Sequence, residues 1–144
     1  MLFRSRIVGP TVFFDSAPRQ VCAVKLPRTN TPLHALTTLN DITYVEAARA
    51  LATRLLNDAT SPKSRLQLAW HRLLARPATA EELRVLLDSL GRYQSRFTAN
   101  PAAAEELLKI GESPRDSRFS PPELAAYTVV CSTLLNLDET LTKE

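Results

Sequence analysis

Five helix-start signals recur along the chain, and they constrain the fold more than any other feature of the sequence. In each, a side-chain oxygen can accept a hydrogen bond from an unpaired backbone N–H of the first helical turn. In four of them a proline follows, whose missing N–H costs nothing at that position. The signals are Thr31-Pro32, Ser61-Pro62, a capping box from Thr79 to Glu82, Asn100-Pro101, and a second capping box from Ser120 to Glu123. Together they predict a mainly α-helical protein.

Apolar residues recur at helical spacing between these signals. Residues 45–56, 66–74 and 83–97 each carry one apolar stripe, whereas the segment that starts at Ser120 is apolar nearly all round. A helix without a polar face is expected to be buried, so we place that helix at the centre. We therefore predict a compact bundle of about five helices over residues 29–144, preceded by a short extended segment at 1–28.

The N-terminal segment is basic. The chain has a formal net charge of +3, but residues 1–28 hold five basic residues and one acidic residue, so they carry +4 and the remainder carries −1. Within this segment Thr11–Phe14 and Val21–Leu26 could each form a short strand that pairs with something else. A basic arm can bind nucleic acid or an acidic partner, but the segment lacks an aromatic stacking platform, so we favour arginines that pair with a neighbour or face water.

The sequence offers little catalytic chemistry. It has two histidines and two cysteines, and it lacks metal-binding patterns such as CxxC and HExxH, the CxxCH haem motif and a glycine-rich phosphate loop. Cys22 and His34 could be a Cys–His pair, but nothing fixes their geometry. Cys22 and Cys131 could pair in an exported protein, although two separately buried thiols are the simpler case. We predict no cofactor, no metal site and no catalytic residue, and the class of any small-molecule ligand stays unknown.

Neither a membrane span nor a signal peptide is indicated. The longest uncharged run near the C-terminal end, residues 124–137, has 14 residues, which is shorter than the roughly 20 that a bilayer requires. The N-terminal MLFRSRIVGPTVFF has a short apolar patch, but Gly9 and Pro10 interrupt it, so we expect no cleavage.

The stretch RTNTPLHALTTLND, residues 28–41, predicts a tight corner between two helices. Pro32 starts a short helix, and Asn40-Asp41 ends it and caps the next one. The apolar residues of this short helix are expected to face inward; they are Leu33, Leu36 and Leu39.

Four segments of the chain resemble one family, in order. They are FDSAPRQVCAVKLPR (residues 14–28), RTNTPLHALTTLNDITYVEAARALATR (28–54), LLARPATAEEL (73–83) and ELAAYTVVCSTLLNLDETLTKE (123–144). The family they resemble is the planctomycete domain of unknown function 1553. His34 stands where the family usually has Gln, and Ile42 stands where it usually has Pro.

The resemblance implies a piece of something larger. Such domains typically occupy the C-terminal part of large exported proteins, often with a cytochrome-c-like domain upstream, so we expect this chain to be a truncated or split-off C-terminal piece with Met1 inside an ancestral domain. Export is implied by the relatives only, because the chain shows no clear export signal. The haem motif is absent, so haem binding is not carried over, and the family supplies no catalytic residues.

The motif residues of structural or functional interest lie within these segments. They are Arg28, Asn30, Pro32, His34, Asn40, Asp41, Glu46, Arg49, Asn136, Asp138 and Glu139.

Three hypotheses for the function follow. The first is a helical module without self-contained catalysis, which packs against a partner chain or a missing N-terminal domain. The second is a segment of an extracellular enzyme acting on polysaccharide, in which case several motif residues would converge on one cleft. The third and weakest is a basic nucleic-acid-binding module, suggested by Arg65, Arg72 and Arg76 near one helix face.

Overall fold

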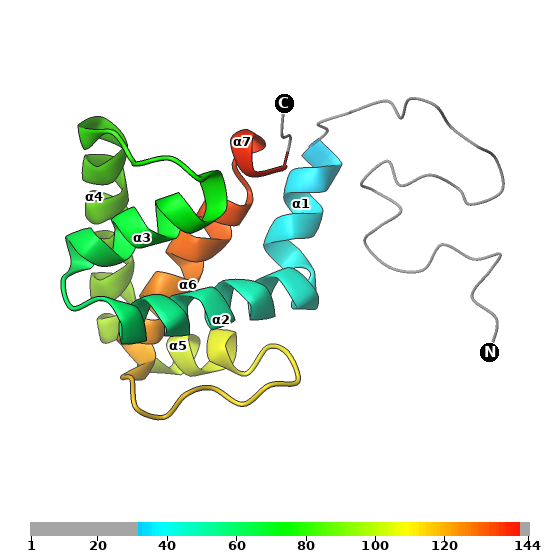
Figure 1. Cartoon of the computed structure of the whole chain (residues 1–144). Coiled ribbons are helices and arrows are strands. Elements are labelled where there is room, and N and C mark those ends of the chain that lie inside the picture. Colours follow the sequence, from blue (N-terminus) through cyan, green and yellow to red (C-terminus); the bar gives the residue numbers. More distant parts are fainter. Residues whose placement is uncertain (1–31, 142–144) are drawn as a thin grey trace, which may run out of the picture.

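The expected mainly α-helical bundle is confirmed by the computed structural model, which describes residues 32–141 apart from the side chains of Leu33 and His34 (Figure 1). Seven helices and no strand are found in this range. They are α1 (Pro32–Asn40), α2 (Ile42–Asp58), α3 (Pro62–Leu74), α4 (Ala80–Ala99), α5 (Pro101–Leu108), α6 (Pro121–Leu135) and α7 (Asp138–Leu141). Three of them are short, since α1, α5 and α7 have 9, 8 and 4 residues.

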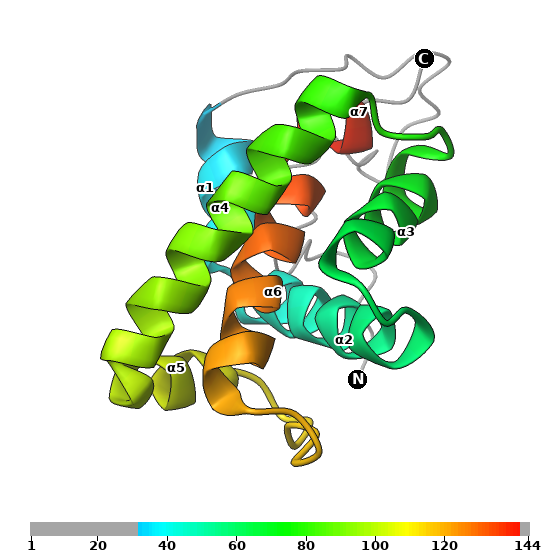
Figure 2. The same cartoon turned by 90° about the vertical axis from the view of Figure 1, so that its left-hand side faces the viewer.

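Helix α6 forms the centre of the bundle, as its all-round apolar sequence predicted. It contacts each of the other six helices, which surround it in Figures 1 and 2. Its buried residues include five consecutive positions and so do not form one stripe; they are Leu124, Ala125, Ala126, Tyr127, Thr128, Val130, Cys131 and Leu134. The buried Thr128 hydroxyl donates to the Leu124 carbonyl at 2.8 Å, so this polar group is satisfied inside the core.

Three of the five predicted helix starts are confirmed at the cap residue itself. Ser61, Thr79 and Asn100 accept a backbone N–H of the following turn, as predicted. Glu82 completes the capping box of Thr79 by accepting from the Thr79 backbone N–H at 2.7 Å. The start at Pro32 is also confirmed, whereas Thr31 lies outside the described residues.

The capping box predicted at Ser120 was wrong. Ser120 is the N-cap of α6 by its extended backbone, but its side chain makes no capping hydrogen bond. Glu123, the expected partner, instead accepts from the Arg65 guanidinium of α3 at 3.0 Å. Glu123 is therefore held by a partner 58 residues away, in a pair whose two groups are both charged, rather than by the local backbone.

The inward orientation predicted for Leu36 and Leu39 was also wrong. Their exposed fractions are 58% and 45%, whereas Thr38 is only 1% exposed. The Thr38 hydroxyl donates to the side-chain oxygen of Asn136, at the end of α6. This polar contact turns α1 so that Thr38 faces the bundle and the two leucines face outward.

Several predictions fall on residues that the structure does not describe. These are the extended segment at 1–28 with its two possible strands, and the residues Cys22, Arg28 and Asn30. Cys131 is a buried free thiol. Among the described helices, none is both long and apolar enough to cross a membrane.

Candidate interaction groove

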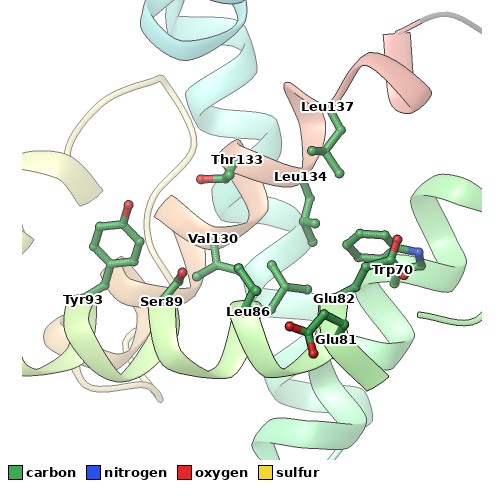
Figure 3. Close-up of a pocket in the computed structure, with 11 residues that line it drawn as sticks. Trp70, Glu81, Glu82, Leu86, Ser89, Tyr93, Val130, Thr133, Leu134 and Leu137 are labelled. Atoms are coloured by element: carbon green, nitrogen blue, oxygen red, sulfur yellow. The ribbon is translucent and has the colours of Figure 1, made fainter. Parts of the chain in front are cut away.

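An apolar groove lies between α4 and α6 and has a volume of about 320 Å³ (Figure 3). Helix α4 contributes Val85, Leu86, Ser89 and Tyr93 to its lining. Helix α6 and the turn after it contribute Val130, Thr133, Leu134 and Leu137, and Trp70 of α3 lies at one end. The volume is at the lower limit of ligand sites in proteins, and it offers room for a few aliphatic side chains.

The groove follows from the residue types along one face of α4. Leu86, Ser89 and Tyr93 are spaced by three and four residues, so they lie one above another on that face. Ser89 is short and leaves a gap between its two large neighbours, and Thr133 is similarly short on α6. Val85 beside this gap is 51% exposed, so the groove opens onto a partly solvated apolar wall.

Charged side chains close the groove at the Trp70 end. Arg76 donates to Glu82 at 2.9 and 3.1 Å and to Glu139 at 2.7 and 2.8 Å. Its guanidinium also lies over the Trp70 ring, 5.2 Å from the centroid. The hydrogen bonds from Arg76, followed by the one from the Thr79 backbone, lower the pKa of Glu82 to about 2, and those from Arg76 lower the pKa of Glu139. We call Arg76, Glu82 and Glu139 the arginine clasp.

Two further side chains lie at this end of the groove. The Nε1 atom of Trp70, a residue only 5% exposed, has no hydrogen-bond partner in the part of the chain that is described. The side chain of Glu81 is 74% exposed and pairs with Arg84 one helical turn away. Because that pair is exposed, it is weak, and its carboxylate stays available to another cation.

The motif residues Glu46 and Arg49 bind the loop that follows α5. Arg49 is 4% exposed and donates to the carbonyls of Leu108, Ile110 (2.8 Å) and Ser113 (2.7 Å). Glu46 accepts the backbone N–H of Ser113 at 2.8 Å and that of Glu112 at 3.2 Å, and its hydrogen bonds to Ser113 lower its pKa. These bonds join α2 to the last residue of α5 and to the loop that follows it, so the two residues support the fold.

Other motif residues mostly bond to their own helix ends. Asn40 donates to the Leu36 carbonyl at 2.8 Å, and Asp41 accepts from the Thr43 N–H at 2.9 Å. Pro32 is the first residue of α1, and His34 also belongs to α1. These groups form the predicted helix–helix corner.

The C-terminal motif residues lie at two other places. Asn136 holds Thr38 of α1, while Asp138 begins α7 and Glu139 joins the arginine clasp. The motif residues that the structure describes are therefore spread over the corner, the loop after α5 and the clasp, and none of them lines the groove.

The three arginines that suggested nucleic-acid binding form ion pairs with carboxylates of the same chain. Arg65 binds Glu123 at 3.0 Å, Arg72 binds Asp58 at 2.6 Å, and Arg76 belongs to the clasp. Within residues 32–141, no group of three or more His, Cys, Asp or Glu side chains is placed to hold a metal ion.

The groove is not predictable from the sequence, because its lining comes from three helices and the turn after α6. The local signal that was present is the small Ser89 inside the apolar face of α4, together with Val85 outside the expected stripe. Neither residue indicates a groove until α6 is placed beside α4.

Comparison with known proteins gives one match. Searches among curated proteins and among solved structures found none. A family model described as "Protein of unknown function (DUF1553)" matches residues 1–90, which run from the N-terminal segment through α1, α2 and α3 into α4. The resemblance of residues 123–144 lies beyond the matched range and stays a prediction. Since the family model matches more than half of the 144 residues, the chain belongs to the DUF1553 family.

Proposed function

We propose that the chain is a structural and interaction module without self-contained catalysis, which packs against another polypeptide through the corner between α1 and α2. The observation that carries this proposal is an apolar surface made by Leu36, Leu39 and Ile42, with exposed fractions of 58%, 45% and 61%. We call these three residues the corner patch. Isolated exposed apolar residues are ordinary, but three of them within seven positions favour a contact surface.

The corner patch is held on a firm support. The Asp41 cap starts α2, the Asn40 side chain closes the end of α1, and Thr38 joins α1 to Asn136. These bonds fix the direction in which Leu36 and Leu39 point before any partner arrives. A preordered surface loses less conformational entropy on binding, which favours association.

The occupant that we propose is an apolar surface of the N-terminal part of a longer family domain, supplied on the same or on a separate chain. The first basis is the resemblance of this chain to the C-terminal part of longer relatives. The second is the position of the patch, since Leu36 and Leu39 lie within the RTNTPLHALTTLND stretch and Ile42 follows it directly. In such an arrangement the leucines that point outward here would complete a shared core.

The enzyme hypothesis has less support from the geometry. It requires the polar motif residues to converge on one cleft, but Asn40 and Asp41 bond to their own backbone neighbours. Asn136 is bound to Thr38, and Glu46 and Arg49 are occupied by the loop after α5. The nucleic-acid hypothesis is similarly weakened, because the three arginines considered for it are ion-paired.

Size-exclusion chromatography with light scattering, combined with binding of an apolar fluorescent dye, tests the proposal. We expect the complete chain to self-associate reversibly and to bind dye, and the variant L36Q/L39Q/I42Q to be monomeric with reduced dye binding and unchanged helicity. Val85→Gln is the control for dye held in the groove. A wild-type chain that stays monomeric at all concentrations and binds no dye would overturn the proposal, as would a triple variant that behaves like the wild type.

A further inference from the structure

We propose that Leu137 and helix α7 close the Trp70 end of the groove and open as a unit when the bond between Arg76 and Glu139 breaks. We call residues 137–141 the latch. This inference goes beyond the proposed function, because it concerns the groove and does not depend on the corner patch. Its basis is the burial of α7, the bonds that hold it, the anchoring of the residue before it and the place of Leu137 in the groove wall.

Helix α7 has little apolar attachment to the bundle. It has four residues, and none of them is buried. Each of the other six described helices has at least one buried residue. Opening α7 therefore exposes less apolar surface than opening any of them, and segments of this kind open locally while the core stays folded.

Polar bonds hold α7 in place. Glu139 accepts from Arg76 at 2.7 and 2.8 Å, and the Thr140 hydroxyl donates to the Leu134 carbonyl at 2.8 Å. The Glu139 side chain is 50% exposed, so water competes for this pair. When Glu139 leaves, Arg76 keeps its bonds to Glu82 and its place over the Trp70 ring. Opening thus leaves no unpaired charge inside the bundle.

The chain is anchored directly before the latch. Asn136 follows α6, and its backbone N–H donates to two carbonyls of that helix, both at 3.2 Å. Its side-chain oxygen accepts from the Thr38 hydroxyl of α1. Residue 136 is therefore bound to two helices, so movement of the latch is expected to begin at Leu137.

Opening the latch changes the groove. Leu137 lines the groove together with Leu134 of α6 and Trp70 of α3 (Figure 3), and it packs against the hydrophobic core. When Leu137 moves away, the groove widens at this end and Trp70, which is 5% exposed in the closed form, gains contact with water. Trp70 is the single tryptophan of the chain, so its fluorescence reports the state of the latch.

Amide hydrogen exchange in the full-length chain, followed by NMR, tests whether the latch opens by itself. The backbone N–H groups of Thr140 and Leu141 donate to the Leu137 carbonyl at 2.9 and 3.2 Å, so their exchange requires α7 to open. We expect them to be less protected than the Cys131 amide of α6 and, unlike it, insensitive to low urea, because local opening exposes little surface. Glu139→Gln should lower their protection about tenfold, since a neutral amide binds a guanidinium more weakly than a carboxylate does.

Acrylamide quenching of Trp70 tests whether the latch covers the groove. The variant E139Q/T140V weakens both side-chain attachments, and we expect its quenching constant to rise about twofold or more, with unchanged far-UV circular dichroism. Thr140→Val alone leaves the arginine clasp intact, so an increase in this variant comes through α7 and not through Arg76. Glu81→Gln, at a groove residue that pairs with Arg84, is the matched control and should change neither measurement.

The inference is overturned if the amides of α7 and α6 share one urea dependence, which would mean that α7 opens only when the whole chain unfolds. It is also overturned if Glu139→Gln leaves the protection of α7 unchanged. A third contrary result is a quenching constant that stays at the wild-type value in E139Q/T140V, or that rises equally in Glu81→Gln.

Discussion

Glu46 and Arg49 bind opposite sides of one residue, Ser113. Glu46 accepts the Ser113 backbone N–H at 2.8 Å, and Arg49 donates to the Ser113 carbonyl at 2.7 Å. The two side chains also lie within 3.5 Å of each other, one helical turn apart on α2. The loop between α5 and α6 is therefore attached to α2 through the main chain of Ser113.

Replacing Arg49 should strongly destabilise the fold. Arg49→Met keeps most of the side-chain volume but removes the donors to the Leu108, Ile110 and Ser113 carbonyls. Hydrogen bonds to charged groups contribute about 1.5–3 kcal/mol each, and the carbonyls left behind are partly buried, so we expect a loss of about 3 kcal/mol or more in the free energy of unfolding. Urea unfolding followed by circular dichroism measures it, with Arg54→Met on the exposed face of α2 as the control. Equal losses for both variants would contradict the assigned role.

Two glycines should respond to alanine in opposite directions. Gly111 has a φ of 101°, and an added Cβ would lie 2.6 Å from Glu46 Oε2. Gly111→Ala should therefore cost about 1–3 kcal/mol through backbone strain and displacement of Glu46. At Gly91, inside α4, an added methyl group would meet nothing within 4 Å, so Gly91→Ala should stabilise the protein by about 0.5–1 kcal/mol. Thermal melts of the two variants check the signs, and a stabilised Gly111→Ala would refute the close contact.

The arginine clasp should make stability sensitive to acid. The pKa of Glu82 falls from 4.5 to about 2 and that of Glu139 is also lowered, so the folded chain binds fewer protons than the unfolded chain between these values. The stabilisation is thus complete above pH 4.5 and is lost as the pH falls toward about 2. Melting temperatures of the wild type and Arg76→Gln should differ most near neutral pH and converge in acid.

The control for the clasp is Arg84→Gln, which breaks the exposed pair with Glu81. This variant should change the melting temperature little at any pH, because exposed pairs contribute little. If the gap between wild type and Arg76→Gln stays constant down to pH 2, its origin is the stacking of Arg76 on Trp70 rather than the two carboxylates.

Cys131 should be unreactive in the folded protein. Burial raises the pKa of its thiol to about 12, so almost no thiolate forms in mildly alkaline buffer. In the variant C22S, a thiol reagent should titrate no cysteine until denaturant is added, and then one. Ser95→Cys in the same background, on the exposed side of α4, should react at once. Rapid reaction of Cys131 in native buffer would show that α6 opens readily.

The helix starts were predictable because their signals are local. Thr79 and Glu82 satisfy each other's backbone groups within four residues, and no distant group is needed to recognise them. The central place of α6 was predictable for a similar reason, since a helix that lacks a polar face has few alternatives to burial.

Each incorrect prediction concerns a residue whose partner is distant in the sequence. Glu123 is bound by Arg65, and α1 is oriented by a bond between residues 98 positions apart, Thr38 and Asn136. Local periodicity favoured Leu36 and Leu39 as core residues, and it contains no information about which face meets α6. The same limit applies to the groove, whose walls come from separate helices, and to the attachment of the α5–α6 loop by Glu46 and Arg49.

The central position of α6 has a consequence for biosynthesis. Helices α1–α5 precede it in the chain, so the ribosome releases their apolar faces before residues 121–135, the surface on which they pack, exist. At that stage the nascent chain has well-marked helix starts, but its apolar faces are not yet covered by α6. Such exposed apolar surface is what chaperones bind. A chain that ends before residue 121 would therefore lack the helix that the other six contact, and the fold is completed only when α6 has been synthesised.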